Sequence, residues 1–144
     1  MNKQNKLIFP IILCLCIAII VFCYKWHQEK NNHSELLELA QWSAEESYDS
    51  FEAFVESGEE RNYWEAVANF RSYLKAYMQY CLKSNLNHTN YTYATDVYYC
   101  LINFPELCQT HIPEFMEITA LLSIDAADPD ADIKMHNLRD NITQ

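Results

Sequence analysis

The sequence predicts an all-α protein in which one N-terminal transmembrane helix precedes a small antiparallel bundle of four to five helices. Three observations predict this class. The 144 residues include a single glycine, Gly58, and only four prolines, too few turn residues for a many-stranded sheet. Residues 7–24 are apolar and uncharged. Beyond residue 33, apolar side chains recur every three to four positions, as they do on one face of a helix.

The shortage of glycine also excludes several kinds of functional site that depend on glycine-rich loops. Phosphate-binding loops, dinucleotide-binding turns and nucleophile elbows require residues that tolerate positive φ, and Gly58 alone cannot supply them. The acidic run at residues 125–132 lacks the glycine and the final glutamate of a calcium-binding loop. His111 and Glu114 have no further histidine at a fitting spacing. We therefore expect no enzyme activity, no cofactor, no metal and no small-molecule ligand.

Residues 1–6 form a short basic lead, and the uncharged residues 7–24 are predicted to form a transmembrane signal-anchor helix. Eighteen helical residues extend over about 27 Å, close to the ~30 Å thickness of the hydrocarbon core. The run ends without the small residues of a signal-peptide cleavage site, which favours an anchor that is retained. We expect a single-pass protein of the cell membrane, and the short polar lead favours an extracytoplasmic C-terminal domain.

Charge separates the anchor from the rest of the chain. Residues 1–30 carry a net charge of +3, whereas residues 31–144 contain six Lys and Arg against nineteen Asp and Glu, a net charge of −13. A domain this acidic repels nucleic acid at long range. The expected partners are therefore the membrane, through residues 7–24, and another protein, but no nucleic acid.

Residues 25–33 are interpreted as a juxtamembrane tether, and residues 34–144 as the acidic helical domain. The first helix of this domain is expected to begin at Ser34, an N-cap followed by acidic residues. Its apolar stripe consists of Leu37, Ala40, Ala44, Tyr48, Phe51 and Val55. Gly58 lies just past the end of this stripe, where a left-handed C-cap requires glycine.

The second helix is expected to begin at Asn62, with Glu65 three residues later as in a capping box. Its apolar stripe consists of Trp64, Val67, Phe70, Leu74, Tyr77 and Cys81. The short connection after Gly58 requires the first two helices to lie antiparallel. Further helices are expected over residues 92–103, from Pro113, and from Asp128, an N-cap followed by proline.

The run Asn62–Val67, with Phe70 after it, resembles the second helix of a tetratricopeptide hairpin. This resemblance implies a helical hairpin that binds peptides or proteins. The matching segment is short, and no repeat of the tetratricopeptide period follows it in the sequence.

Tyrosine is the first candidate for a contact surface. The chain has ten tyrosines, more than a small domain can bury, and exposed tyrosine is typical of interfaces. We expect a groove between the second and third helices of the domain, lined by Tyr73, Tyr77, Tyr80 and Tyr98.

An acidic row on the first helix of the domain is the second candidate. It includes Glu45, Asp49 and Glu52. Antiparallel pairing about position 60 predicts that Arg71 reaches Asp49 and that Lys75 reaches Glu45. The carboxylates left exposed would suit a basic partner.

These patterns favour a membrane-anchored protein-interaction domain, an accessory subunit at the cell envelope. The alternative is an acidic inhibitor of the immunity type, which masks the basic surface of a toxin or an enzyme.

Overall fold

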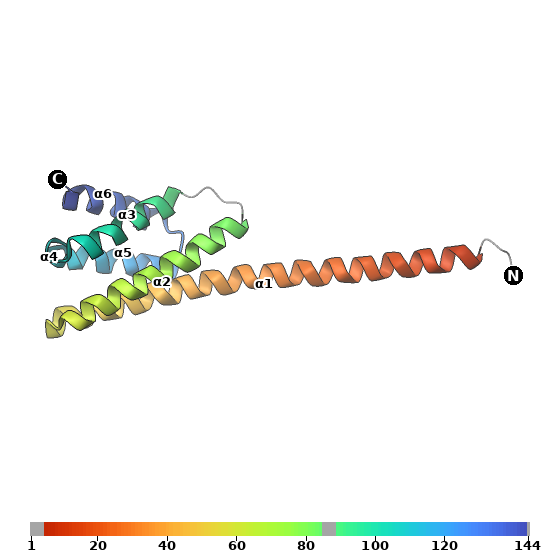
Figure 1. Cartoon of the computed structure of the whole chain (residues 1–144), viewed down its shortest axis with the longest axis horizontal. Coiled ribbons are helices and arrows are strands. Elements are labelled where there is room, and N and C mark those ends of the chain that lie inside the picture. The colour runs from red at the N-terminus through yellow and green to blue at the C-terminus, as the bar shows by residue number, and fades with distance from the viewer. Residues whose placement is uncertain (1–4, 85–88, 144) are drawn as a thin grey trace. The chain divides into compact units, whose positions relative to one another are not determined.

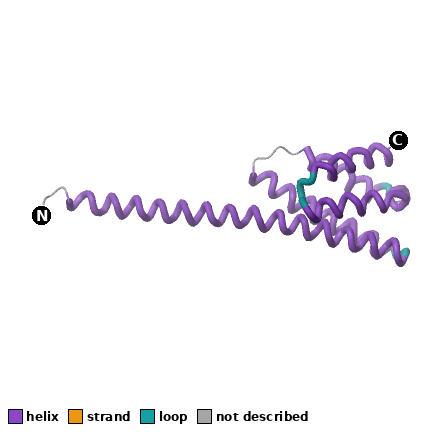
Figure 2. The backbone as a smooth tube through the Cα atoms, turned by 180° about the vertical axis from the view of Figure 1, so that it is seen from behind, coloured by secondary structure: helices purple, strands orange, loops and turns teal. Residues whose placement is uncertain are grey.

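The structure is a computed structural model that describes the backbone of residues 5–84 and 89–143, and the side chains of residues 13–28, 32–84 and 92–143. Every regular element in this part of the chain is helical, which confirms the predicted all-α class and the helical bundle (Figures 1 and 2). In chain order the elements are α1 (Asn5–Ser57), α2 (Glu60–Ser84), α3 (Thr89–Asn103), α4 (Pro105–Cys108), the 3-10 turn η1 (Gln109–His111), α5 (Ile112–Ile124) and α6 (Pro129–Thr143).

The chain divides into two compact units, Met1–Ser34 and Glu35–Gln144, and α1 contributes residues to both. The helix expected to begin at Ser34 is therefore the continuation of a helix that begins at Asn5. Residues 25–33 are helical because they contain no glycine or proline to interrupt the backbone hydrogen bonds. An N-cap residue does not start a new helix where the preceding turns are already helical.

In the part of the chain that the structure describes, no helix is both long enough and apolar enough to cross a membrane. Of the predicted transmembrane segment, residues 7–12 lie outside the residues with described side chains. The structure therefore does not support the transmembrane helix expected at residues 7–24.

In the unit Glu35–Gln144, α1 and α2 lie antiparallel, and α3, α5 and α6 pack against them around one core (Figure 1). The α1 side of this core is built from small residues: Ala40, Ser43, Ala44 and Ser47 are all buried. Small side chains let two helices approach closely. Across this contact the Ser47 hydroxyl donates a hydrogen bond to the Ala66 carbonyl at 2.9 Å. Phe51, one turn further along, stacks on Phe115 of α5 at 5.7 Å between ring centroids.

The turn between α1 and α2 is shorter than expected. Gly58 follows α1 directly with φ of 69°, and its N–H donates to the Phe54 carbonyl at 2.8 Å. The next helix begins at Glu60, so Asn62 is not its N-cap. The Asn62 side chain instead donates to the Ser57 hydroxyl at 2.9 Å, and the Glu59 N–H donates to the same oxygen at 3.1 Å.

The core-facing side of α2 matches the prediction except at its first residue. Val67, Phe70, Leu74, Tyr77 and Cys81 are buried as expected. Trp64, however, is 39% exposed, and its neighbour Tyr63 is fully buried in its place. The Tyr63 hydroxyl can be buried because it donates a hydrogen bond to the Leu101 carbonyl of α3 at 2.8 Å.

The last helix begins where the sequence predicts. The Asp128 carboxylate accepts hydrogen bonds from the backbone N–H groups of Asp130, at 2.8 Å, and Ala131, at 2.9 Å. Pro129 then occupies the first helical position. Arg139 of α6 joins this helix to α3 through an ion pair with Asp96 at 3.3 Å and by lying over the Tyr93 ring at 5.2 Å.

The left-handed backbone of Gly58 gives a first test of the fold. Gly58→Ala should lower the free energy of unfolding by about 1 kcal/mol, because a side chain is strained at this φ. An added Cβ would meet no atom within 4 Å, so backbone strain is the only expected cost. Denaturant unfolding of the full chain measures the change. Gly58→Asn should lose less, since asparagine enters this region more readily. Equal stability of the alanine variant and the parent chain would contradict the assignment.

Candidate functional site

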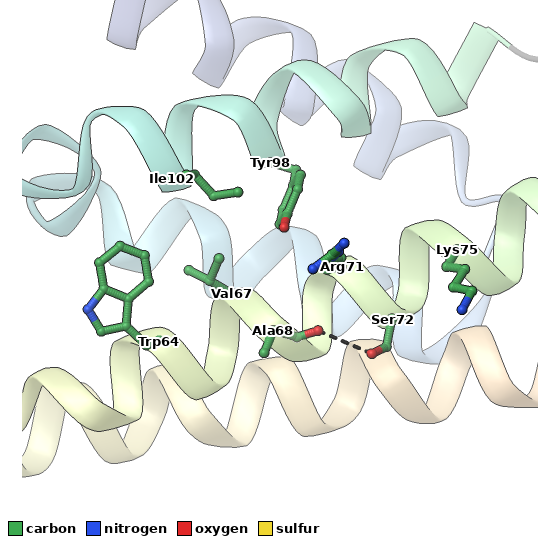
Figure 3. Close-up of a pocket in the computed structure, with 8 residues that line it drawn as sticks. All are labelled: Trp64, Val67, Ala68, Arg71, Ser72, Lys75, Tyr98 and Ile102. Carbon is green, nitrogen blue, oxygen red and sulfur yellow. Dashed lines mark hydrogen bonds between the residues drawn. The ribbon is translucent and has the colours of Figure 1, made fainter.

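A groove of about 560 Å³ runs between α2 and α3 on the surface of the bundle. Its α2 wall is a single stripe of residues three or four positions apart, as expected for one helical face: Trp64, Val67, Ala68, Arg71, Ser72 and Lys75. Tyr98 and Ile102, one turn apart on α3, form the opposite wall (Figure 3). From Trp64 to Lys75 the groove extends over about 16 Å of helix.

The groove has an apolar end and a cationic end. Figure 3 shows Trp64, Val67 and Ile102 towards one end, with Arg71 beneath Tyr98 and Lys75 further along α2. Val67 is buried and forms the floor, whereas Ile102 is 41% exposed. None of the lining residues is acidic. The lining can therefore accept an apolar group at one end and an anionic group at the other.

The indole of Trp64 is held in place by its own helix. Its N–H donates to a Glu60 carboxylate oxygen at 3.2 Å. Its ring packs edge-on against the buried Tyr63 ring, with centroids 5.2 Å apart. A partly exposed aromatic side chain that is already ordered loses little conformational entropy when a partner binds.

Arg71 and Lys75 do not make the ion pairs that the sequence predicts. Within the described part of the chain, the Arg and Lys side chains that form ion pairs are Arg61, Lys134 and Arg139. The predicted pairs of Arg71 with Asp49 and of Lys75 with Glu45 are therefore wrong.

The residue of α2 that faces α1 at this level is Asn69. Its amide donates to the Glu46 carbonyl at 3.2 Å and to the Ser50 hydroxyl at 3.3 Å. Arg71 lies further around α2, where it lines the groove towards α3, and Lys75 lies between that groove and a second hollow shared with α1. The antiparallel register about position 60 brings the right segments together, but neither cation forms an ion pair with the predicted carboxylate.

Of the four tyrosines predicted to line a groove here, only Tyr98 does so. Tyr73 and Tyr77 are buried, and Tyr80 is half-buried at the edge of the core. The three rings stack in succession, with centroids 5.7 Å apart for Tyr73 and Tyr77 and 6.3 Å apart for Tyr77 and Tyr80. The Tyr73 hydroxyl donates to the Ala126 carbonyl at 2.9 Å, which satisfies its polar atom inside the core.

The acidic row on α1 lies opposite its buried face. Glu45, Asp49 and Glu52 are all exposed, and in the described residues none of the three forms an ion pair. Trp42, one turn before Glu45, is 56% exposed. With Leu39 and Lys75 it also lines a second hollow of about 420 Å³ between α1 and α2.

The cysteines of the domain are buried, and His111 is paired with a neighbouring carboxylate. Cys81, Cys100 and Cys108 are free and buried, and burial raises the pKa of Cys108 to about 12. A thiol with so high a pKa is protonated at neutral pH and a poor nucleophile. His111 and Glu114 pair with each other at 3.3 Å. In the described residues no group of three or more His, Cys, Asp or Glu side chains is arranged to hold a metal ion.

The comparisons with known proteins return no match. No protein-family profile matches the chain, and neither a curated protein nor a solved structure is significantly similar to it. The resemblance of residues 62–70 to a tetratricopeptide helix is thus not accompanied by a match to that family.

The buried tyrosines predict the response of the fold to alkaline pH. Burial raises the pKa of Tyr63, Tyr73 and Tyr77 well above the value of about 10 for a free tyrosine. Their contribution to stability is full below the unfolded-state pKa and is lost as the pH rises above about 10, because only the unfolded chain then releases the protons. Helix loss by circular dichroism should coincide with ionisation of a late-titrating tyrosine fraction, followed by tyrosinate absorbance. Ionisation of every tyrosine before any helix is lost would contradict this prediction.

Proposed function

We propose that the protein is a single-pass membrane protein whose acidic helical domain binds another protein, as an accessory subunit at the cell envelope. The observation that carries the proposal is the α2–α3 groove. It combines an exposed, pre-ordered tryptophan with two cations that have no ion-pair partner in the described part of the chain. Aromatic and arginine side chains at a partly exposed groove are typical of protein interfaces.

The proposed anchor is the segment of residues 7–24, which contains no charged residue. From Leu13 to Tyr24 every described side chain is exposed, including Ile20 at 66% and Phe22 at 64%. An apolar helix that no other part of its own unit covers is stabilised by the hydrocarbon of a bilayer. Tyr24 and Trp26, after the apolar run, suit the interface between lipid and water.

Membrane fractionation and a topology reporter test the anchor. The full chain should stay in the membrane pellet after alkaline carbonate extraction, and Ile17→Asp combined with Ile20→Asp should release it, because charges in the hydrocarbon core are costly. Ile124→Asp with Ile133→Asp, which changes two exposed residues of the helical domain, is the matched control. A phosphatase fused after residue 144, active only outside the cytoplasm, should be active. Equal release of the parent chain and both variants would overturn the anchor.

The second candidate function is inhibition of a basic toxin or enzyme through the acidic row. It is favoured by the exposure of Glu45, Asp49 and Glu52 and by the failure of Arg71 and Lys75 to neutralise them. Carboxylates that have no partner within the chain complement a basic surface and speed its association.

Site-specific photocrosslinking in membranes distinguishes the two functions. A photoreactive residue at Ile102 in the groove should capture a defined partner, whereas one at Ile133 on α6 should not. Reversal of Glu45, Asp49 and Glu52 to Lys should leave this capture within about twofold if the groove is the binding surface. If the acidic row is the binding surface, a photoreactive residue at Trp42, one turn before Glu45, should capture the partner instead, and the same reversal should abolish that capture. Absence of a specific product from both Ile102 and Trp42 would contradict both functions.

A further inference from the structure

We infer that the α2–α3 groove binds a short acidic peptide segment of the partner protein. An apolar side chain of the segment lies between Trp64 and Ile102, and its carboxylates lie against Arg71 and Lys75. This inference rests on the proposed protein-binding function and adds to it the chemistry of the ligand.

The distribution of cations supports an anionic ligand. Residues 31–144 contain only six Lys and Arg beside nineteen Asp and Glu. Arg61, Lys134 and Arg139 pair with carboxylates of their own domain. Two of the other three, Arg71 and Lys75, lie in one groove whose lining contains no acidic residue. At physiological ionic strength charges are screened over about 8 Å, so a bound carboxylate interacts most strongly with the cations that it contacts.

The spacing of the cations fits neighbouring carboxylates of one peptide. Arg71 and Lys75 are four residues apart on one face of α2, a rise of about 6 Å. A guanidinium can hold one carboxylate through two parallel hydrogen bonds, and an ammonium can hold a second. Figure 3 shows the Tyr98 hydroxyl directed towards Arg71, where it can donate to the same carboxylate.

The other end of the groove fits an aliphatic or aromatic side chain. Val67 provides a buried apolar floor, and Trp64 and Ile102 flank it with 39% and 41% of their surfaces exposed. An extended peptide advances about 3.3 Å per residue, so about five residues cover the 16 Å from Trp64 to Lys75. The ligand is therefore a segment with an apolar residue three or four positions from its acidic residues.

The probe for this inference is a displayed library of random seven-residue peptides, selected on the full chain in lipid nanodiscs. Selection should enrich peptides that contain both acidic and apolar residues. Arg71→Glu with Lys75→Glu should weaken their binding at least tenfold in fluorescence anisotropy. The matched control is Arg61→Glu with Lys83→Glu, which reverses one Arg and one Lys on the same helix and gives the same net charge. It should change binding less than twofold.

Two further variants test the apolar end. Ile102→Asn should weaken the binding of the selected peptides at least fivefold, and Ile133→Asn, which changes another exposed isoleucine on α6, should not. Circular dichroism of each variant should match the parent chain, since only exposed side chains are changed.

The inference is overturned if no peptide is enriched, if enriched peptides lack acidic residues, or if both charge-reversed pairs bind them equally. It is also overturned if the groove takes a second copy of this chain, seen as self-association that Arg71→Glu with Lys75→Glu abolishes. The protein-binding function can be tested independently of the acidic ligand. If a photoreactive residue at Ile102 captures a partner, and Arg71→Glu with Lys75→Glu does not reduce that capture, the groove binds a protein but not through an acidic segment.

Discussion

The hydroxyl groups of two buried tyrosines on α2 fix the arrangement of the bundle. Tyr63 bonds to the Leu101 carbonyl of α3, and Tyr73 bonds to the Ala126 carbonyl between α5 and α6. A buried hydroxyl without a partner would cost roughly 1–3 kcal/mol, so α2 keeps the rotation in which both bonds form. That rotation decides which stripe of α2 enters the core and which stripe remains at the boundary with α3. The candidate groove is a consequence of it.

The sequence predicts the features of this fold that depend on neighbours along the chain. Gly58 has a left-handed backbone and ends α1, and Asp128 caps α6 with its carboxylate. Both signals act within one helical turn, so they can be recognised without a tertiary structure. The expected helix start at Ser34 fails because capping preferences are weak compared with the continuation of an existing helix.

The candidate site could be predicted only in part, because it depends on the rotation of α2. Tyr63 and Trp64 lie about 100° apart around the helix, and only this first residue of the expected inner face differs, since Val67, Phe70, Leu74, Tyr77 and Cys81 are buried as predicted. Tyr73 is buried on the same face, and Arg71 and Lys75 lie at its border, where they line the groove with α3. Tyr and Trp are both large and amphipathic, so apolar periodicity does not distinguish Tyr63 from Trp64 as the inner residue. The partner of the Tyr63 hydroxyl lies 38 positions away in the sequence, whereas the partner of the Trp64 indole lies on the same helix, and only the fold reveals this difference.

The same rotation leaves two surfaces of opposite charge on one small domain. The acidic row of α1 and the cations of α2 do not neutralise each other, because the short side chains of Ser47 and Asn69 occupy the contact between the two helices. Long side chains that paired across this contact would each have contributed only ~0.2–1 kcal/mol at an exposed position. The stability of the fold therefore depends little on such ion pairs. Charges that a fold does not use remain available to steer and orient a partner. The groove joins its cations to an ordered tryptophan, whereas the acidic row presents charge along a solvated helix face.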